Sequence, residues 1–165
     1  MNHTQLKSAV LELLRLRSDY TTSRASSENA FDFPLYAYLE GRYGSMSRQH
    51  PIRIAGRQRV SRIDFRKGTN NPLLLEFAVR PPTGGSQLYG TTNTAELRKL
   101  CRIPYSRARG LILLLIDLYR SPIIKPRLKA TYDDVHSGRG GAFSRRAVSI
   151  IYIHQDLQYT FRWKR

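Results

Sequence analysis

Cysteine is nearly absent from this chain of 165 residues, which contains Cys101 alone. A single thiol provides neither an intramolecular disulfide framework nor a cysteine-based zinc site, so we expect a reducing, intracellular setting. Long apolar runs are also missing, since the longest, Leu111 to Ile116, is far short of the ~20 residues that cross a bilayer. The first residues show no signal-peptide pattern. The sequence therefore predicts a soluble protein of the cytoplasm, or of the nucleus in a eukaryote, with no membrane partner.

Acidic residues are scarce, with 12 Asp and Glu against 28 Lys and Arg, and the formal net charge is +16. Only six of the 28 basic residues are lysines, so arginine dominates, and its planar fork suits phosphate groups. Each phosphate that such a protein neutralises releases condensed counterions. A nucleic acid, with DNA favoured over RNA, is the expected partner, and an anionic membrane or an acidic protein is the competing explanation.

Several catalytic motifs are absent as well. The four histidines show neither an HxH nor an HExxH spacing, so the sequence indicates no zinc site. There is no GxxxxGK phosphate loop and no recognisable serine or cysteine nucleophile motif. These absences leave acidic side chains as the candidates for chemistry.

Hydrophobic periodicity predicts an α/β protein with a mixed central sheet flanked by helices. Helical spacing indicates helices at 4–17, 28–43, 93–101 and, less regularly, 126–135. Pro34 lies inside the second of these, so we expect that helix to begin near Phe33. Strands are predicted at 52–54, 60–66 and 73–80 as a meander, at 111–118 as a buried strand, and at 148–154 with 158–164 as a β-hairpin. One domain spanning 1–165 accommodates all of them.

Two carboxylates on the predicted meander are the most informative residues. Asp64 lies on one strand and Glu76 on the next, each among apolar neighbours. Side chains alternate along a strand, so Glu76 shares a face with Arg80, and pairing of the two strands can bring Asp64 and Glu76 together. Carboxylates from adjacent strands are a common way to hold a divalent cation. We therefore expect their side chains to lie close enough to share one.

At this point the chain resembles the PD-(D/E)xK nuclease superfamily. The matching elements are a helix bearing Glu28, a strand with Asp64, the next strand with Glu76, a capped helix and the buried strand 111–118. The resemblance covers about residues 28–118 and leaves the helix 4–17 and the hairpin 148–164 as additions. It implies a restriction-endonuclease-like fold, a site for Mg²⁺ or Mn²⁺ with Asp64 and Glu76 as ligands, and an auxiliary acid at Glu28.

One position departs from the family pattern. The lysine that orients the attacking water belongs two residues after the Glu, where this chain has Ala78. Arg80 lies on the same strand face and would stabilise charge, but a guanidinium stays protonated and cannot serve as a base. The chain is therefore either a weak or atypical metal-dependent endonuclease or a catalytically inactive, DNA-binding relative. An RNA- or ribonucleoprotein-binding component, or an accessory subunit of a larger nucleic-acid machine, is the alternative without an active site.

Each candidate acid also has a simpler, non-catalytic explanation. For Asp64 alone, a surface ion pair with neighbouring arginines is the commoner situation. Glu76 would also be satisfied by Arg62 or Arg80, and Glu28 near a helix start is equally typical of a residue that interacts with the helix dipole. The expected phosphate contacts are Arg59, Arg62, Arg66, Lys67, Arg98 and Arg102. Binding as a homodimer or within a larger nucleoprotein complex is compatible with them.

Two further features of the sequence have two alternative explanations each. Asp117 ends an apolar strand and is either an additional acid near the site or a residue at the exposed end of that strand. Tyr159, Phe161 and Trp163 alternate along the last predicted strand. They would form either a stacking platform for single strands or, more commonly for a hairpin, a packed core.

Overall fold

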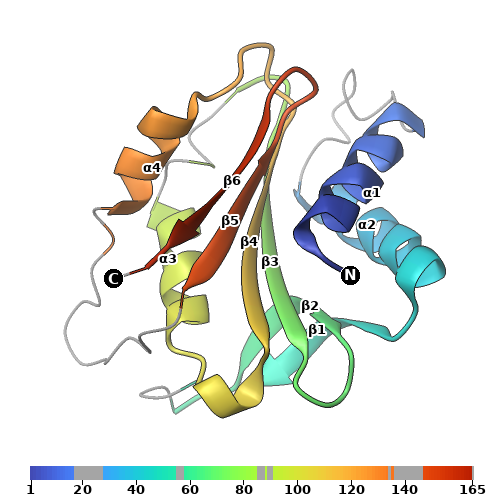
Figure 1. Cartoon of the computed structure of the whole chain (residues 1–165), viewed down its shortest axis with the longest axis vertical. Helices are drawn as coiled ribbons and strands as arrows, with labels where there is room; N and C mark the ends of the chain where they lie inside the picture. Colours follow the sequence, from blue (N-terminus) through green and yellow to red (C-terminus); the bar gives the residue numbers. More distant parts are fainter. Residues whose placement is uncertain are drawn as a thin grey trace.

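The computed structural model describes residues 1–16, 28–54, 58–84, 88, 91–133, 135 and 147–164, and for 28, 29, 91–93 and 105 it describes the backbone only. Within that part, the residues form four α-helices and a six-stranded sheet (Figure 1). None of the described helices is long and apolar enough to cross a membrane. The predicted α/β class is confirmed.

The sheet is mixed, and its strand order follows the chain. Its strands are β1 (Met46–Ile52), β2 (Ser61–Lys67), β3 (Leu73–Arg80), β4 (Gly110–Asp117), β5 (Val148–Ile153) and β6 (Gln158–Trp163). The first three strands are antiparallel neighbours, as the predicted meander requires. The next two are parallel to β3, and β6 returns antiparallel to β5. The predicted C-terminal hairpin is therefore confirmed.

Helices cover both faces of the sheet. They are α1 (His3–Leu16), α2 (Glu28–Tyr43), α3 (Thr91–Cys101) and α4 (Lys125–Asp133), with a one-turn 3₁₀ helix, η2, at Tyr105–Arg107. Figure 1 shows α1 and α2 on one face and α3 and α4 on the other. Because both faces are covered, all eight residues of β3 are buried, including two charged ones. A near-continuous apolar sequence is what such a central strand needs.

Two boundaries differ from the sequence-based expectation. The helix α2 begins at Glu28 and continues through Pro34, instead of starting near Phe33. Phe31, Leu35 and Leu39 are fully buried from this one helix. Their burial outweighs the ~3 kcal/mol that a proline costs inside a helix. The strand predicted at 52–54 is wrong at both ends, because the ladder with β2 runs from Met46 to Ile52 and leaves Ile54 outside it.

The aromatic residues of β6 belong to the core. Phe161 and Trp163 are buried in the apolar cluster on the α3 and α4 side of the sheet, and Tyr159 packs against it. The indole N–H of Trp163 donates a hydrogen bond of 2.8 Å to the carbonyl oxygen of Tyr132. Packing, and not a stacking platform, is therefore what this strand face provides.

Candidate functional site

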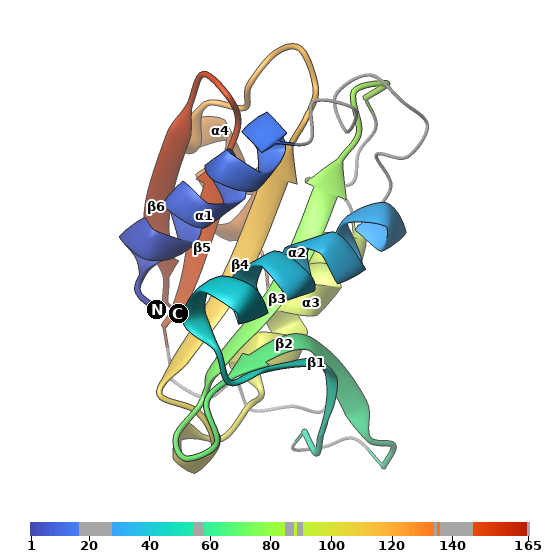
Figure 2. The same ribbon diagram turned by 90° about the vertical axis from the view of Figure 1, so that its right-hand side faces the viewer.

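The β1–β2 hairpin separates from the rest of the sheet beside Asp64. In Figure 2 both strands turn away from β3, and β2 pairs with β3 only at Phe65–Lys67. Asp64 is the next residue along, and its carboxylate occupies the place where strand pairing stops. Its Oδ2 accepts a 3.0 Å hydrogen bond from the N–H of Phe77, and its Oδ1 accepts one of 3.3 Å from Nε2 of Gln49. The carboxylate thus lies between two strands and beside Glu76.

Glu76 is only 1% exposed, and α3 supplies its counterion. The Nζ of Lys99 lies 2.7 Å from Oε1 of Glu76. Burial raises the pKa of Glu76 well above its usual value, and the negative charges of Asp64 and Glu96 raise it further, while Lys99 acts in the opposite direction. The Glu76 carboxyl group is therefore held in a position where its ionised form is unfavourable.

Lys99 has two further acceptors besides Glu76 among the described residues. It also forms an ion pair with Glu96, one turn away on α3, and donates a 3.0 Å hydrogen bond to the carbonyl oxygen of Arg62. Burial acts to lower the pKa of Lys99, but the charges and hydrogen bonds of Glu76 and Glu96 outweigh it, so the net pKa is raised. The ammonium therefore stays protonated at neutral pH and acts as a donor.

A third carboxylate approaches Asp64 from the opposite helix layer. Asp32 of α2 has its Oδ2 3.2 Å from Nε of Arg48. Its Oδ1 is buried and has no hydrogen-bond partner among the described residues. Burial raises the pKa of Asp32, Arg48 lowers it, and the charge of Asp64 raises it. The carboxylate of Asp64 therefore interacts electrostatically with two other carboxylates, those of Asp32 and Glu76.

Asp32 was not singled out from the sequence, whereas Glu28 was. Glu28 is the first residue of α2, and its side chain lies outside the described part of the structure. The two acids are four residues apart and so share one face of the helix. That spacing is the signal that would have drawn attention to Asp32.

The carboxylates leave more negative than positive charge at this point. Lys99 forms ion pairs with Glu76 and Glu96, and the negative charge of Asp64 acts on Glu76 as well. The described residues contain no group of three or more His, Cys, Asp or Glu side chains arranged to hold a metal ion. Magnesium, however, is often held by one or two carboxylates plus substrate phosphates. The surplus charge and the unpaired oxygen of Asp32 fit a divalent cation bound through Asp64 and Glu76.

Arg80 does not reach Glu76. Its Nε lies 2.7 Å from Oδ1 of Asp117, and its Nη2 lies 2.6 Å from Oδ2 of Asp117 and from the carbonyl oxygen of Ser121. The hydroxyl group of Tyr152 donates to the same carboxylate. Asp117 is the last residue of β4 but is buried, and its carboxylate is bound by Arg80 and Tyr152, so the expected exposed strand end is wrong. This network ties β3, β4 and β5 together, and its evident role is structural.

The expected phosphate contacts fall into three groups. Lys67 donates to the carbonyl oxygens of Tyr43 and Gly44 at the end of α2, and Arg66 donates to that of Thr69, at 2.5 Å. Arg59 and Arg62 are exposed and line a pocket of about 280 Å³ together with Glu96 and Lys99. Arg98 and Arg102 are half-buried on α3. The exposed pair is therefore the part of the set that borders the carboxylates.

Comparison with protein-family models, with curated proteins and with solved structures found no match for this chain. The geometry of the site is therefore the basis for assigning a function.

Proposed function

We propose that this protein binds DNA and hydrolyses its phosphodiester bonds, with Mg²⁺ or Mn²⁺, at a site of the PD-(D/E)xK type. The observation that carries the proposal is the position of Lys99. Its ammonium group contacts Glu76, beside Asp64, although it comes from α3 and not from the strand position of Ala78. Lys99 would therefore provide the cationic donor that the family pattern places at the position of Ala78.

The roles follow from the contacts. Asp64 and Glu76 would hold the metal ion, which when bound polarises the phosphate and lowers the pKa of a bound water. Lys99 would donate a hydrogen bond to that water or to a phosphate oxygen, since its raised pKa keeps it protonated. Arg59 and Arg62 would bind the flanking phosphates from the adjacent pocket.

Within the α/β class, the topology supports a restriction-endonuclease-like fold. A helix, three antiparallel strands, a helix and a parallel strand follow one another as α2, β1, β2, β3, α3 and β4. The additions are α1 before them and the β5–β6 hairpin after them. In this proposal the carboxylates occupy the strands of the meander, at the point where β2 leaves β3.

A catalytically inactive DNA-binding protein is the second candidate. It is favoured by the ion pairs that already engage Lys99 with both Glu76 and Glu96. In such a network Lys99 would serve as the counterion of these carboxylates in place of a metal. An RNA- or ribonucleoprotein-binding role needs only the charge of +16.

Cleavage and binding tests separate these candidates. Duplex DNA, single-stranded DNA and structured RNA are incubated with the protein in Mg²⁺, Mn²⁺ or EDTA, and binding is titrated over a range of salt concentrations. We expect metal-dependent DNA cleavage that Asp64→Asn and Lys99→Met abolish, whereas Arg120→Gln, an exposed arginine elsewhere, retains it. Tight, salt-dependent binding without cleavage would instead establish the inactive candidate. Preference for RNA would overturn the choice of DNA, and a flat salt response would refute phosphate binding altogether.

A further inference from the structure

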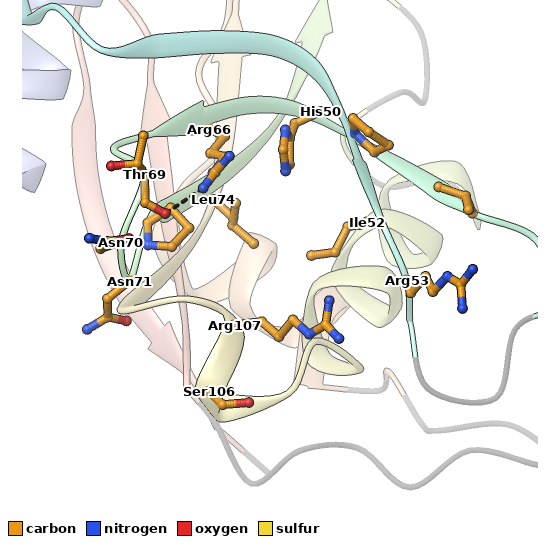
Figure 3. Close-up of a pocket in the computed structure, with 13 residues that line it drawn as sticks. His50, Ile52, Arg53, Arg66, Thr69, Asn70, Asn71, Leu74, Ser106 and Arg107 are labelled. Carbon is orange, nitrogen blue, oxygen red and sulfur yellow. Dashed lines mark hydrogen bonds between the residues drawn. The ribbon is translucent and has the colours of Figure 1, made fainter.

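A second cavity, of about 570 Å³, is lined by residues of β1, β2 and β3 (Figure 3). The β1–β2 hairpin and the following turn contribute most of its wall, and η2 closes the other side. Its lining includes His50, Ile52, Arg53, Arg66, Leu74 and Arg107, and it includes no acidic residue. Protein pockets that bind small ligands have volumes of roughly 300–1,000 Å³. The cavity is therefore large enough for one nucleotide.

The cationic groups of this cavity lack an anionic partner within its lining. Figure 3 shows the side chains of His50, Arg66 and Arg107 around a common space. Arg66 uses Nη2 to bind the carbonyl oxygen of Thr69, but its Nε is buried and has no hydrogen-bond partner among the described residues. Arginine guanidinium groups bind phosphate through charge-assisted hydrogen bonds, and no acidic residue of the lining competes for them. The cavity is therefore complementary to a phosphate group.

The lowered pKa of His50 is consistent with the positive charge of the cavity. Burial lowers the pKa of His50, and the positive charge of Arg66 lowers it further. Arg53, Arg66 and Arg107 are the charged groups that line the same cavity. A bound phosphate would favour the protonated imidazole, so its arrival should raise the pKa of His50.

Part of the remaining wall is apolar, and the uncharged polar residues Thr69, Asn70, Asn71 and Ser106 make up the rest. Ile52 and Leu74 are buried side chains of the core that reach the cavity, and Pro51, Val60 and Pro72 complete this surface. A sugar or base edge packs against such a surface, whereas a free inorganic anion makes no use of it. A phosphate with an attached nucleoside therefore fits the lining better than phosphate alone.

The cavity is in line with the carboxylates. Arg66 follows Asp64 by two residues on β2, and Leu74 precedes Glu76 by two residues on β3. Two residues of a strand span about 6.6 Å. That step is comparable to the separation of successive phosphates along an extended nucleic-acid strand. A strand with one phosphate in the cavity would place a neighbouring phosphate near Asp64 and Glu76.

We propose that this cavity is a nucleotide subsite, in which Arg66 and Arg107 bind one phosphate of a DNA strand that continues to the Asp64–Glu76 site. The inference rests on the proposed DNA binding and adds the residues that set the position of the strand. The same phosphate chemistry is offered by a free mononucleotide, so the two sources have to be distinguished by experiment.

The test uses the full chain in EDTA, so that neither metal binding nor cleavage contributes. Affinity for a single-stranded oligodeoxynucleotide is measured for the wild type, Arg66→Gln, Arg107→Gln and the matched control Arg120→Gln. Each cavity variant should raise Kd about tenfold or more and reduce the salt slope by about one. The control should change Kd less than twofold. Trp163 fluorescence during urea unfolding verifies that every variant is folded.

The second readout is the imidazole resonance of His50 in NMR titrations with the oligonucleotide, with 2′-deoxyadenosine 5′-monophosphate and with inorganic phosphate. We expect the oligonucleotide to shift it at the lowest concentration and to raise its pKa. Wild-type affinity in both cavity variants would overturn the subsite while leaving DNA binding intact. If no oligonucleotide binds but the mononucleotide shifts His50, the proposed DNA binding fails, and the strand subsite fails in favour of a free nucleotide.

Discussion

The ammonium group of Lys99 lies 2.7 Å from the carboxylate of Glu76, although one residue belongs to α3 and the other to β3. Both side chains are largely buried, and the carboxylate of Asp64 lies close enough to raise the pKa of Glu76. A helix thus supplies the counterion of a buried carboxylate on the central sheet.

Removal of the Lys99 ammonium group should destabilise the fold. Lys99→Met leaves Glu76 buried without its counterion, and breaking a buried ion pair typically costs about 3–5 kcal/mol. The free energy of unfolding is measured by urea titration, followed by the fluorescence of Trp163, which is buried. Lys99→Arg keeps the charge and should lose much less. Equal stability of the methionine variant and the wild type would show that the pair contributes nothing.

The raised pKa of Glu76 gives stability a defined dependence on pH. The contribution of a group whose folded-state pKa is raised is fully present below its unfolded-state value, here about 4.5, and is lost as the pH rises through the folded-state pKa. Glu76→Gln does not titrate. The variant should therefore gain stability relative to the wild type as the pH rises from 5 to 8.

Urea titrations at both pH values, at constant ionic strength, check this expectation. A difference between variant and wild type that does not change with pH would show that the folded state does not perturb Glu76. Asp133→Asn, which removes an exposed carboxylate paired only with Lys129 among the described ion pairs, serves as the control.

Arg80 should matter for stability and not for chemistry. Arg80→Met leaves the buried carboxylate of Asp117 without its bidentate partner, and a loss of about 3–5 kcal/mol is expected. The double variant Arg80→Met with Asp117→Leu removes both charges and should recover part of that loss. A double variant no more stable than Arg80→Met would contradict this explanation. A stable Arg80→Met protein with strongly reduced DNA cleavage would show instead that the arginine acts at the site.

Ala78→Lys tests whether the strand position can accept the missing lysine. Ala78 is 1% exposed and belongs to the apolar cluster beneath α3 and α4. A lysine there would overpack the core and bury a charge, so we expect a loss of about 3 kcal/mol or more and no gain in cleavage. Ala78→Met adds similar volume without charge and should lose less. Higher activity of the lysine variant would mean that the core opens enough for an ammonium group to reach Glu76.

Local periodicity predicted most of the elements, because period and turn residues are local properties. The alternation in β2 and β3 and the apolar run of β4 identified the central strands, and the aromatic alternation of β6 identified the hairpin. The start of α2 was not predictable, because the burial of Phe31 and Leu35 outweighs the local effect of Pro34.

For the site, the sequence by itself indicated two acids on neighbouring strands of the meander, and the register that pairs Phe65 with Leu75 in the structure places Asp64 next to Glu76. Only the tertiary structure decided their partners. The crossover helix α3 brings Lys99 onto Glu76, α2 brings Asp32 near Asp64, and the parallel strand β4 brings Asp117 to Arg80. These contacts join residues on separate elements, and their distances depend on how the two helical layers pack on the sheet, which no local pattern encodes.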